Sequence, residues 1–273
     1  MKLGVVGKGG TGKTTVSALV CLAYVNRGKR VLAVDTDSNP NLALSLGLDE
    51  SAADSAPLVP RSVVMGSGRT GLTPAGLIAQ YGLSTPVGVT LLHAMRVDQA
   101  GSGCTCASHA SVRSLLGAAI EDEADLTLVD MEAGIEHLSR SGGTLAHADV
   151  LLMIMEPTRK SIMTARRTMA LAEELGIPRL AGVGNKARLP EDAKFFAEVC
   201  TEYDVPLAGI VPYAPDVVAA DRQGTRVDLA PGPVRHAIEA IVDFIESPEA
   251  QRLALLAEKE RIEARLAHLS AAV

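Results

Sequence analysis

Glycine, lysine and threonine are concentrated in one short segment near the amino terminus. Residues 7–15 read Gly7-Lys8-Gly9-Gly10-Thr11-Gly12-Lys13-Thr14-Thr15. The spacing fits the pattern G-x-x-x-x-G-K-S/T, in which glycines let backbone N–H groups approach phosphate oxygens closely. In that pattern Lys13 faces the β- and γ-phosphates and stabilises their charge, while the Thr14 hydroxyl is a ligand for Mg²⁺. The segment predicts a phosphate-binding loop for a nucleoside triphosphate.

Aspartates stand where two apolar segments end. Asp35 and Asp37 close the first segment, and Asp130 closes the second. Carboxylates at the carboxyl ends of strands beside a phosphate loop handle Mg²⁺ or the attacking water. We expect Asp130 to hold Mg²⁺ through water. Two other interpretations remain: Asp37 caps a helix that begins near Asn41, and Asp130 belongs to a plain acidic turn.

The four cysteines fall into two kinds. Cys21 and Cys200 lie in apolar helical patterns, so we expect small buried side chains. Cys104 and Cys106 form a Cys-x-Cys pair, and thiolates bind soft or borderline metals. One pair is too small for a closed site, but a two-fold dimer would supply four thiolates for tetrahedral zinc or for nickel. Taken alone, such a pair is more often incidental than metal-binding.

Strand and helix patterns alternate along the chain. The expected strands are Leu3–Val6, Val31–Asp35, Val89–His93, Leu126–Asp130, Val150–Glu156, Ala181–Asn185 and Leu207–Val211. The expected helices include Thr14–Arg27, Arg159–Leu175 and Glu191–Tyr203. Several strands are apolar at consecutive positions, which indicates burial on both faces. The alternation predicts an α/β fold with a doubly wound, mostly parallel sheet flanked by helices.

One domain accounts for most of the chain. We expect a single ATPase domain over residues 1–248, with an irregular insertion at 51–85 that is rich in Ser, Ala, Gly and Pro. Residues 249–273 predict a C-terminal helix, with Leu255, Ile262, Leu266 and Leu269 on one face.

Composition limits the class of protein. The 273 residues are 47% hydrophobic and 21% charged, which is ordinary for a globular chain. The formal net charge of −6 and the balanced charge of the C-terminal helix argue against nucleic acid or a membrane surface as partner. Gly and Lys interrupt the first apolar residues, so we expect no signal peptide and a cytoplasmic location.

A second lysine, Lys8, directly follows the first glycine of the loop. In this respect the sequence resembles the deviant Walker A family of MinD, ParA and the nitrogenase iron protein, which are SIMIBI-type P-loop NTPases. The resemblance implies an ATPase that dimerises with ATP bound, with Lys8 reaching the partner's nucleotide. It also implies that Asp37 orients or activates water and that Asn185 reads adenine, with Pro212 and Tyr213 in a second base-contacting segment.

The cysteine pair and three later segments narrow the resemblance further. Gly103–Cys106, Asp130–Arg140, Glu156–Ser161 and Gly184–Lys186 are similar to one subgroup, the CooC-type accessory ATPases for nickel insertion into carbon monoxide dehydrogenase. That likeness implies nickel or zinc at Cys104 and Cys106 across a dimer interface, and a client resembling carbon monoxide dehydrogenase. Ser38 departs from the proline that members often carry after the two aspartates.

Two other functions remain open at this point. A ParA- or MinD-type positioning ATPase would bind DNA or membrane in its ATP form, and would need a basic surface or tail. An electron-transfer protein with a dimer-bridging iron–sulfur cluster would resemble the nitrogenase reductase, in which the two cysteines of each chain are widely separated.

Overall fold

Strands and helices alternate through the described residues of the computed structural model, which are 1–60, 73–94, 123–132, 145–249, 252, 256, 259 and 263. The strands are β1 (Lys2–Gly7), β2 (Val31–Asp35), β3 (Leu83–Ser84), β4 (Val89–His93), β5 (Leu126–Asp130), β6 (Val150–Met155), β7 (Leu180–Ala187) and β8 (Leu207–Pro212). The helices are α1 (Lys13–Asn26), α2 (Leu42–Ser45), α3 (Glu50–Asp54), α5 (Pro74–Tyr81), α8 (Arg159–Glu174), α9 (Pro190–Glu202), α10 (Pro215–Gln223) and α11 (Pro233–Ile245).

The eight strands form one sheet in the order β3-β4-β2-β5-β1-β6-β7-β8. Neighbouring strands are parallel except at one edge, where β3 pairs antiparallel with β4. The predicted mostly parallel, doubly wound sheet is confirmed. Strand β3 was not predicted, because a two-residue strand is too short to show a period.

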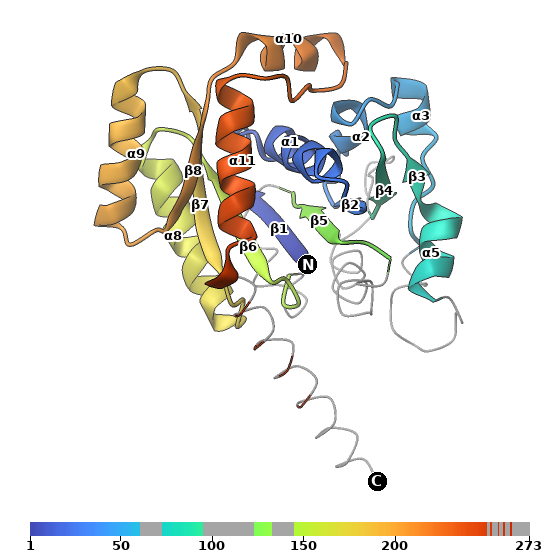
Figure 1. Ribbon diagram of the computed structural model, residues 1–273, viewed down its shortest axis with the longest axis horizontal. Helices are drawn as coiled ribbons and strands as arrows, with labels where there is room; N and C mark the ends of the chain where they lie inside the picture. The colour runs from blue at the N-terminus through green and yellow to red at the C-terminus, as the bar shows by residue number, and fades with distance from the viewer. Residues whose placement is uncertain are drawn as a thin grey trace, which may run out of the picture.

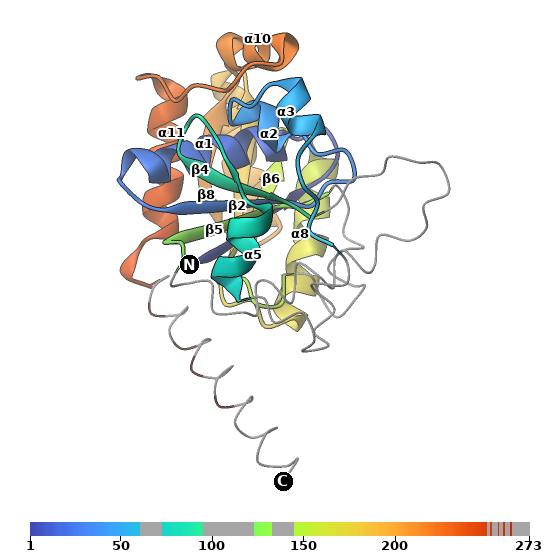
Figure 2. The same ribbon diagram turned by 90° about the vertical axis from the view of Figure 1, so that its right-hand side faces the viewer.

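Helices cover both faces of the sheet, and Figure 2 shows α11 and α8 on opposite sides. Successive residues of β6 alternate between the two layers. Leu152 and Ile154 belong to the core that includes residues of α1 and α11, whereas Leu151 and Met153 belong to the core that includes residues of α8 and α9. Strands buried on both faces need apolar residues at consecutive positions, which is the pattern seen in the sequence.

Helix α11 was not predicted, although its sequence carries the signal. Ile238, Ile241, Val242 and Ile245 are fully buried at helical spacing, and Pro233 stands in the first turn. The helix lies in front of β8 in Figure 1. A Cβ on Gly209 would lie 2.7 Å from Cγ1 of Ile241, so β8 and α11 pack too closely for a larger residue there.

The segment expected as an irregular insertion contains ordered elements, so that prediction is wrong for its described parts. Helix α3 begins where Asp49 accepts a hydrogen bond from the N–H of Ala52 at 2.8 Å. Helix α5 begins where Thr73 accepts from Gly76 at 3.1 Å, with Pro74 next in sequence. These are ordinary N-cap signals, which the weak apolar period obscured.

The C-terminal segment is described at few positions. Arg252, Leu256, Lys259 and Glu263 are helical and exposed, and the four residues assigned to one apolar face lie outside the described residues. Among the helices that the structure describes, none is long and apolar enough to cross a membrane.

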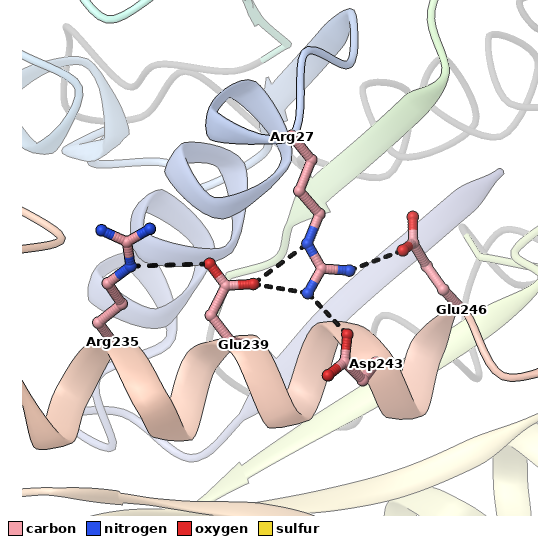
Figure 3. Close-up of polar contacts among 5 residues, drawn as sticks. All are labelled: Arg27, Arg235, Glu239, Asp243 and Glu246. Atoms are coloured by element: carbon pink, nitrogen blue, oxygen red, sulfur yellow. Dashed lines mark hydrogen bonds and ion pairs between the residues drawn. The ribbon is translucent and has the colours of Figure 1, made fainter. Parts of the chain in front are cut away.

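An ion network ties the end of α1 to α11 (Figure 3). Arg27, at the C-terminal end of α1, contacts Glu239 at 2.5 Å, Asp243 at 2.7 Å and Glu246 at 2.7 Å. Arg235 approaches the same Glu239 at 3.9 Å. The Arg27 side chain is 25% exposed. One guanidinium thus holds three carboxylates of α11 together, and it anchors the far end of the helix that begins at the phosphate loop.

We expect Arg27→Met to lower the free energy of unfolding by about 1–2 kcal/mol, because three neighbouring carboxylates lose their shared cation. Chemical denaturation measures the loss, which should shrink in about 0.5 M NaCl as the remaining repulsion is screened. Lys194→Met is the control, since Lys194 makes an exposed pair with Glu198 within one helix. A loss no larger than that of the control would contradict the account.

Candidate nucleotide site

The predicted phosphate loop connects β1 to α1. Gly12 immediately precedes α1 and has left-handed φ and ψ of 91° and 29°, which suits glycine. Within the loop, the Thr11 hydroxyl donates to the carbonyl of Lys8 at 2.8 Å. Lys13 is the first residue of α1 and is only 7% exposed. The helix therefore directs its N-terminal N–H groups and Lys13 toward an anion in the loop.

A cleft of about 800 Å³ opens at this loop. Its walls bring together most of the residues predicted for the site. The cleft is lined by Gly9, Gly10, Gly12, Lys13, Thr14, Thr15, Asp37, Asn185 and Pro212, among others. Thr11 is buried in the loop behind the cleft, Asp130 is buried, and Lys8 is exposed outside the lining.

The end of β7 packs against the phosphate loop. Asn185 donates from Nδ2 to the carbonyl of Thr11 at 2.8 Å. Lys186 donates to the carbonyl of Gly10 and pairs with Glu156 at 2.8 Å. Two carbonyls of the loop, those of Gly10 and Thr11, are thus hydrogen-bonded from β7. Asn185 was predicted to contact the base, whereas the support that Lys186 and Glu156 give the loop was not predicted.

Side chains from two segments form a wall of the cleft beyond Asn185. The guanidinium of Arg188 lies 4.1 Å from the ring centroid of Tyr213, and the N–H of Tyr213 donates to Ala187 at 2.7 Å. Pro212 precedes Tyr213 at the end of β8. A flat cation–aromatic pair beside an amide offers a surface suited to a nucleotide base. Arg188 was not predicted, because an isolated arginine in a loop gives no sequence signal.

Two aspartates lie side by side below the loop. Asp35 on β2 and Asp130 on β5 are directly paired in the register of the parallel strands, and each is 1% exposed. Asp130 accepts from the Ser17 hydroxyl at 3.0 Å. Asp35 accepts from the N–H groups of Asp37 and Leu42, both at 3.0 Å.

The electrostatics of this pair favour a cation. Burial raises the pKa of Asp35, and the charge of Asp130 raises it further. Burial also raises the pKa of Asp130, although hydrogen bonds from Thr14 and Ser17 and the charge of Lys13 act in the opposite direction. Buried carboxylates that resist ionisation lack a counter-charge, which a divalent cation would supply.

The donors present fit Mg²⁺. Asp130, Asp35 and the Thr14 hydroxyl, which hydrogen-bonds Asp130, would supply oxygen ligands. Within the described ranges, no three His, Cys, Asp or Glu side chains converge as a ready-made metal site. That agrees with the usual Mg²⁺ site beside a nucleotide, where one or two carboxylates are completed by phosphate oxygens and water.

Asp37 lies on the loop after β2 and lines the cleft. Its Oδ1 accepts from the N–H of Asn39 at 2.9 Å. The alternative role, capping the following helix, belongs instead to Asp35, which accepts from Leu42 at the start of α2. No separate role was predicted for Asp35. Its position at the end of an apolar strand was the signal available in the sequence.

The remaining predictions concern the cysteines. Cys21 and Cys200 are buried as expected, at 0% and 2% exposure. Burial raises the pKa of the Cys200 thiol to about 11, so this thiol is un-ionised at neutral pH. Cys104 and Cys106 lie outside the described residues.

Comparisons with known proteins point to one family. Residues 5–227 match the model of the CobQ/CobB/MinD/ParA nucleotide binding domain. The chain is 34% identical over 245 residues to the carbon monoxide dehydrogenase accessory protein CooC of Rhodospirillum rubrum, covering 85% of this chain and 91% of that protein. It is 33% identical over 259 residues to an uncharacterised ATP-binding protein of Methanocaldococcus jannaschii, covering 90% and 97%.

A solved structure shares the fold. The septum site-determining protein MinD of Pyrococcus horikoshii, complexed with Mg-ADP, superposes with a TM-score of 0.67 at 19% identity. The match covers 90% of this chain and 96% of that one.

We expect Gly12→Ala to weaken Mg-ADP binding at least about ten-fold, or 1.4 kcal/mol. A Cβ at this position would overlap Nδ2 of Asn185, and φ is 91°. Gly176→Ala is the matched control, because its φ of 71° carries similar strain but its Cβ would meet nothing within 4 Å. Calorimetric titration should find the control at wild-type affinity. Equal affinity of both variants for Mg-ADP would refute the packing argument.

Without Mg²⁺, we expect the stability of the protein to fall as the pH rises through the range above about pH 4, the ordinary Asp value. The raised pKa values of Asp35 and Asp130 mean that the folded state holds more protons there than the unfolded state. Between about pH 5 and 7.5, wild type in EDTA should lose about 1–2 kcal/mol more than Asp130→Asn in denaturant unfolding. Adding Mg-ADP should stabilise wild type and reverse the trend. Parallel pH profiles for the two proteins in EDTA would disprove this.

Proposed function

The chain belongs to the CobQ/CobB/MinD/ParA nucleotide-binding family, and from that premise we propose that it is an ATP-hydrolysing dimeric switch that delivers a metal to a client enzyme. One observation carries the nucleotide part of the proposal. The buried pair Asp35 and Asp130 lies where a glycine-rich loop meets a helix N-terminus, and Asp37 lines the same cleft. The phosphates of a nucleotide would bind at the loop, and a cation at the carboxylates would balance their negative charge.

ATP is the proposed nucleotide, with Asn185 reading its adenine. The amide of Asn185 donates to Thr11, which leaves its oxygen as an acceptor. Such an acceptor suits an exocyclic amino group rather than a carbonyl. Pro212 and the stacked Arg188 and Tyr213 provide the remaining wall.

In this proposal, hydrolysis depends on charged groups around the cleft. Lys13 and the N–H groups of residues 9–15 stabilise the phosphate charge, and Thr14 and Asp130 hold Mg²⁺. Mg²⁺ held there would neutralise part of the charge on the phosphates. Asp37 orients or activates the attacking water from the wall of the cleft, on a loop whose backbone is bonded to Asp35.

Dimerisation is the proposed consequence of ATP binding. Lys8 belongs to the phosphate loop yet is exposed and lies outside the lining of the chain's own cleft. In the proposed dimer it contacts the nucleotide of the partner chain and adds a second positive charge at the phosphates. Homodimer formation would then depend on which nucleotide is present.

The cargo is a divalent metal, nickel or zinc, held by Cys104 and Cys106 of both chains. Four thiolates match the number that a tetrahedral site needs. The similarity to a carbon monoxide dehydrogenase accessory protein supports a client of that kind. ATP binding would assemble the four-thiolate site, and hydrolysis would open it for transfer. We further propose that the protein acts in the cytoplasm without binding nucleic acid or membrane.

A positioning ATPase of the ParA or MinD type is the alternative. It would use the same nucleotide site without carrying metal. Nucleotide-dependent pelleting with DNA or with anionic vesicles would favour it over the metal switch.

We expect purified protein with Mg-ATP to bind about one nickel or zinc ion per dimer, and the Cys104→Ala/Cys106→Ala variant to bind neither metal. Inductively coupled plasma analysis after equilibrium dialysis against nickel or zinc measures the stoichiometry. Cys200→Ala serves as the control, because it removes a buried thiol and leaves the Cys-x-Cys pair intact. Unchanged stoichiometry in the double variant would eliminate the proposed metal site.

A further inference from the structure

The loop that carries Asp37 is bonded mainly to its own residues. The N–H of Asn39 donates to Asp37 at 2.9 Å, and the side-chain amide of Asn41 donates to the carbonyl of Asn39 at 2.8 Å. At its base, the N–H of Asp37 donates to Asp35 at 3.0 Å. These contacts give the loop a local shape, but they leave its tip to be fixed by something outside the loop.

One contact reaches across from the loop tip to the segment after β5. The hydroxyl of Ser38 donates to Oε1 of Glu132 at 2.8 Å, and both side chains are partly buried. Nearer the strands, Thr36 donates from its N–H and its hydroxyl to the carbonyl of Asp130, at 3.0 and 2.9 Å. The loop with Asp37 and the segment with Asp130 are thus joined at two successive points.

The Ser38–Glu132 contact lies next to Asp37, the residue proposed to act in hydrolysis. Ser38 adjoins Asp37, and Glu132 follows Asp130 by two residues. A hydrogen bond to a carboxylate is roughly twice as strong as one between neutral groups. Fixing Ser38 therefore fixes the backbone from which the Asp37 side chain projects into the cleft.

We propose that the Ser38–Glu132 hydrogen bond is a positioning contact that holds Asp37 in register with the Mg²⁺ site of Asp130. The inference rests on the proposed ATP hydrolysis. A catalytic group displaced by about 1 Å loses much of its rate advantage, whereas nucleotide affinity, which comes from the phosphate loop, does not depend on this contact. The contact therefore governs turnover and leaves binding unaffected.

The test compares steady-state ATP hydrolysis in variants at positions 38 and 132. Ser38→Ala should lower kcat about five- to ten-fold, with KM for ATP and Kd for Mg-ADP within about two-fold of wild type. Ser38→Thr keeps a hydroxyl and should restore at least half of the wild-type kcat. Glu132→Gln keeps an acceptor oxygen and should lose less than Ser38→Ala.

Two further variants complete the design. Combining Ser38→Ala with Glu132→Ala should cost no more than the worse single change, because both remove one contact. Glu132 makes additional interactions, so the Ser38 variants carry the main result. Ser55→Ala is the matched control, since the Ser55 hydroxyl donates to a carbonyl at 2.7 Å in an exposed helix outside the cleft.

The possible results distinguish a failure of the positioning contact from a failure of the proposed ATP hydrolysis. An unchanged kcat in Ser38→Ala, or a loss that Ser38→Thr does not restore, would overturn the positioning contact while leaving hydrolysis standing. A matching rise in Kd for Mg-ADP would overturn it too, because the residue would then act on binding. Wild type without turnover, or full turnover in Asp37→Asn, would overturn the hydrolysis mechanism itself.

Discussion

Two like charges buried side by side are the constraint on which this structure depends. Asp35 and Asp130 are fixed opposite each other by the pairing of β2 with β5, and both are almost completely buried. Such a pair is unfavourable without a cation nearby. Lys13, the Thr14 hydroxyl and the phosphate loop lie beside the pair. In the proposed mechanism, this unfavourable pair would favour the joint binding of Mg²⁺ and a polyphosphate.

The rest of the molecule holds that arrangement from several sides. Asn185 and Lys186 bond carbonyls of the loop from the end of β7, and Arg27 fixes the far end of α1 to α11. Asp35 bonds the starts of both the Asp37 loop and α2. These contacts connect the phosphate loop to segments that are distant in sequence, as the proposed nucleotide-dependent switch requires.

Much of the fold and of the candidate site could be predicted from the sequence where one physical signal dominated. Strands buried on both faces gave apolar runs, and β2, β4 and β5 match their predicted bounds. The glycine–lysine spacing identified the loop, and strand ends identified Asp37 and Asp130. Helix α11 was readable from its apolar spacing but was missed, and the capped helices α3 and α5 were hidden by a weak period. Arg188, Lys186, Glu156 and Glu132 act through contacts with residues far along the chain, which no local pattern reveals.

The central claim is that the nucleotide bound at the phosphate loop determines whether two chains form a dimer. Its most direct test is the solution mass of Asp37→Asn protein, which should bind ATP without consuming it, measured by analytical ultracentrifugation with Mg-ADP and with Mg-ATP. The account predicts a larger dimer fraction with ATP than with ADP, and no such increase when Lys8→Ala is added. An identical mass distribution with both nucleotides would contradict it.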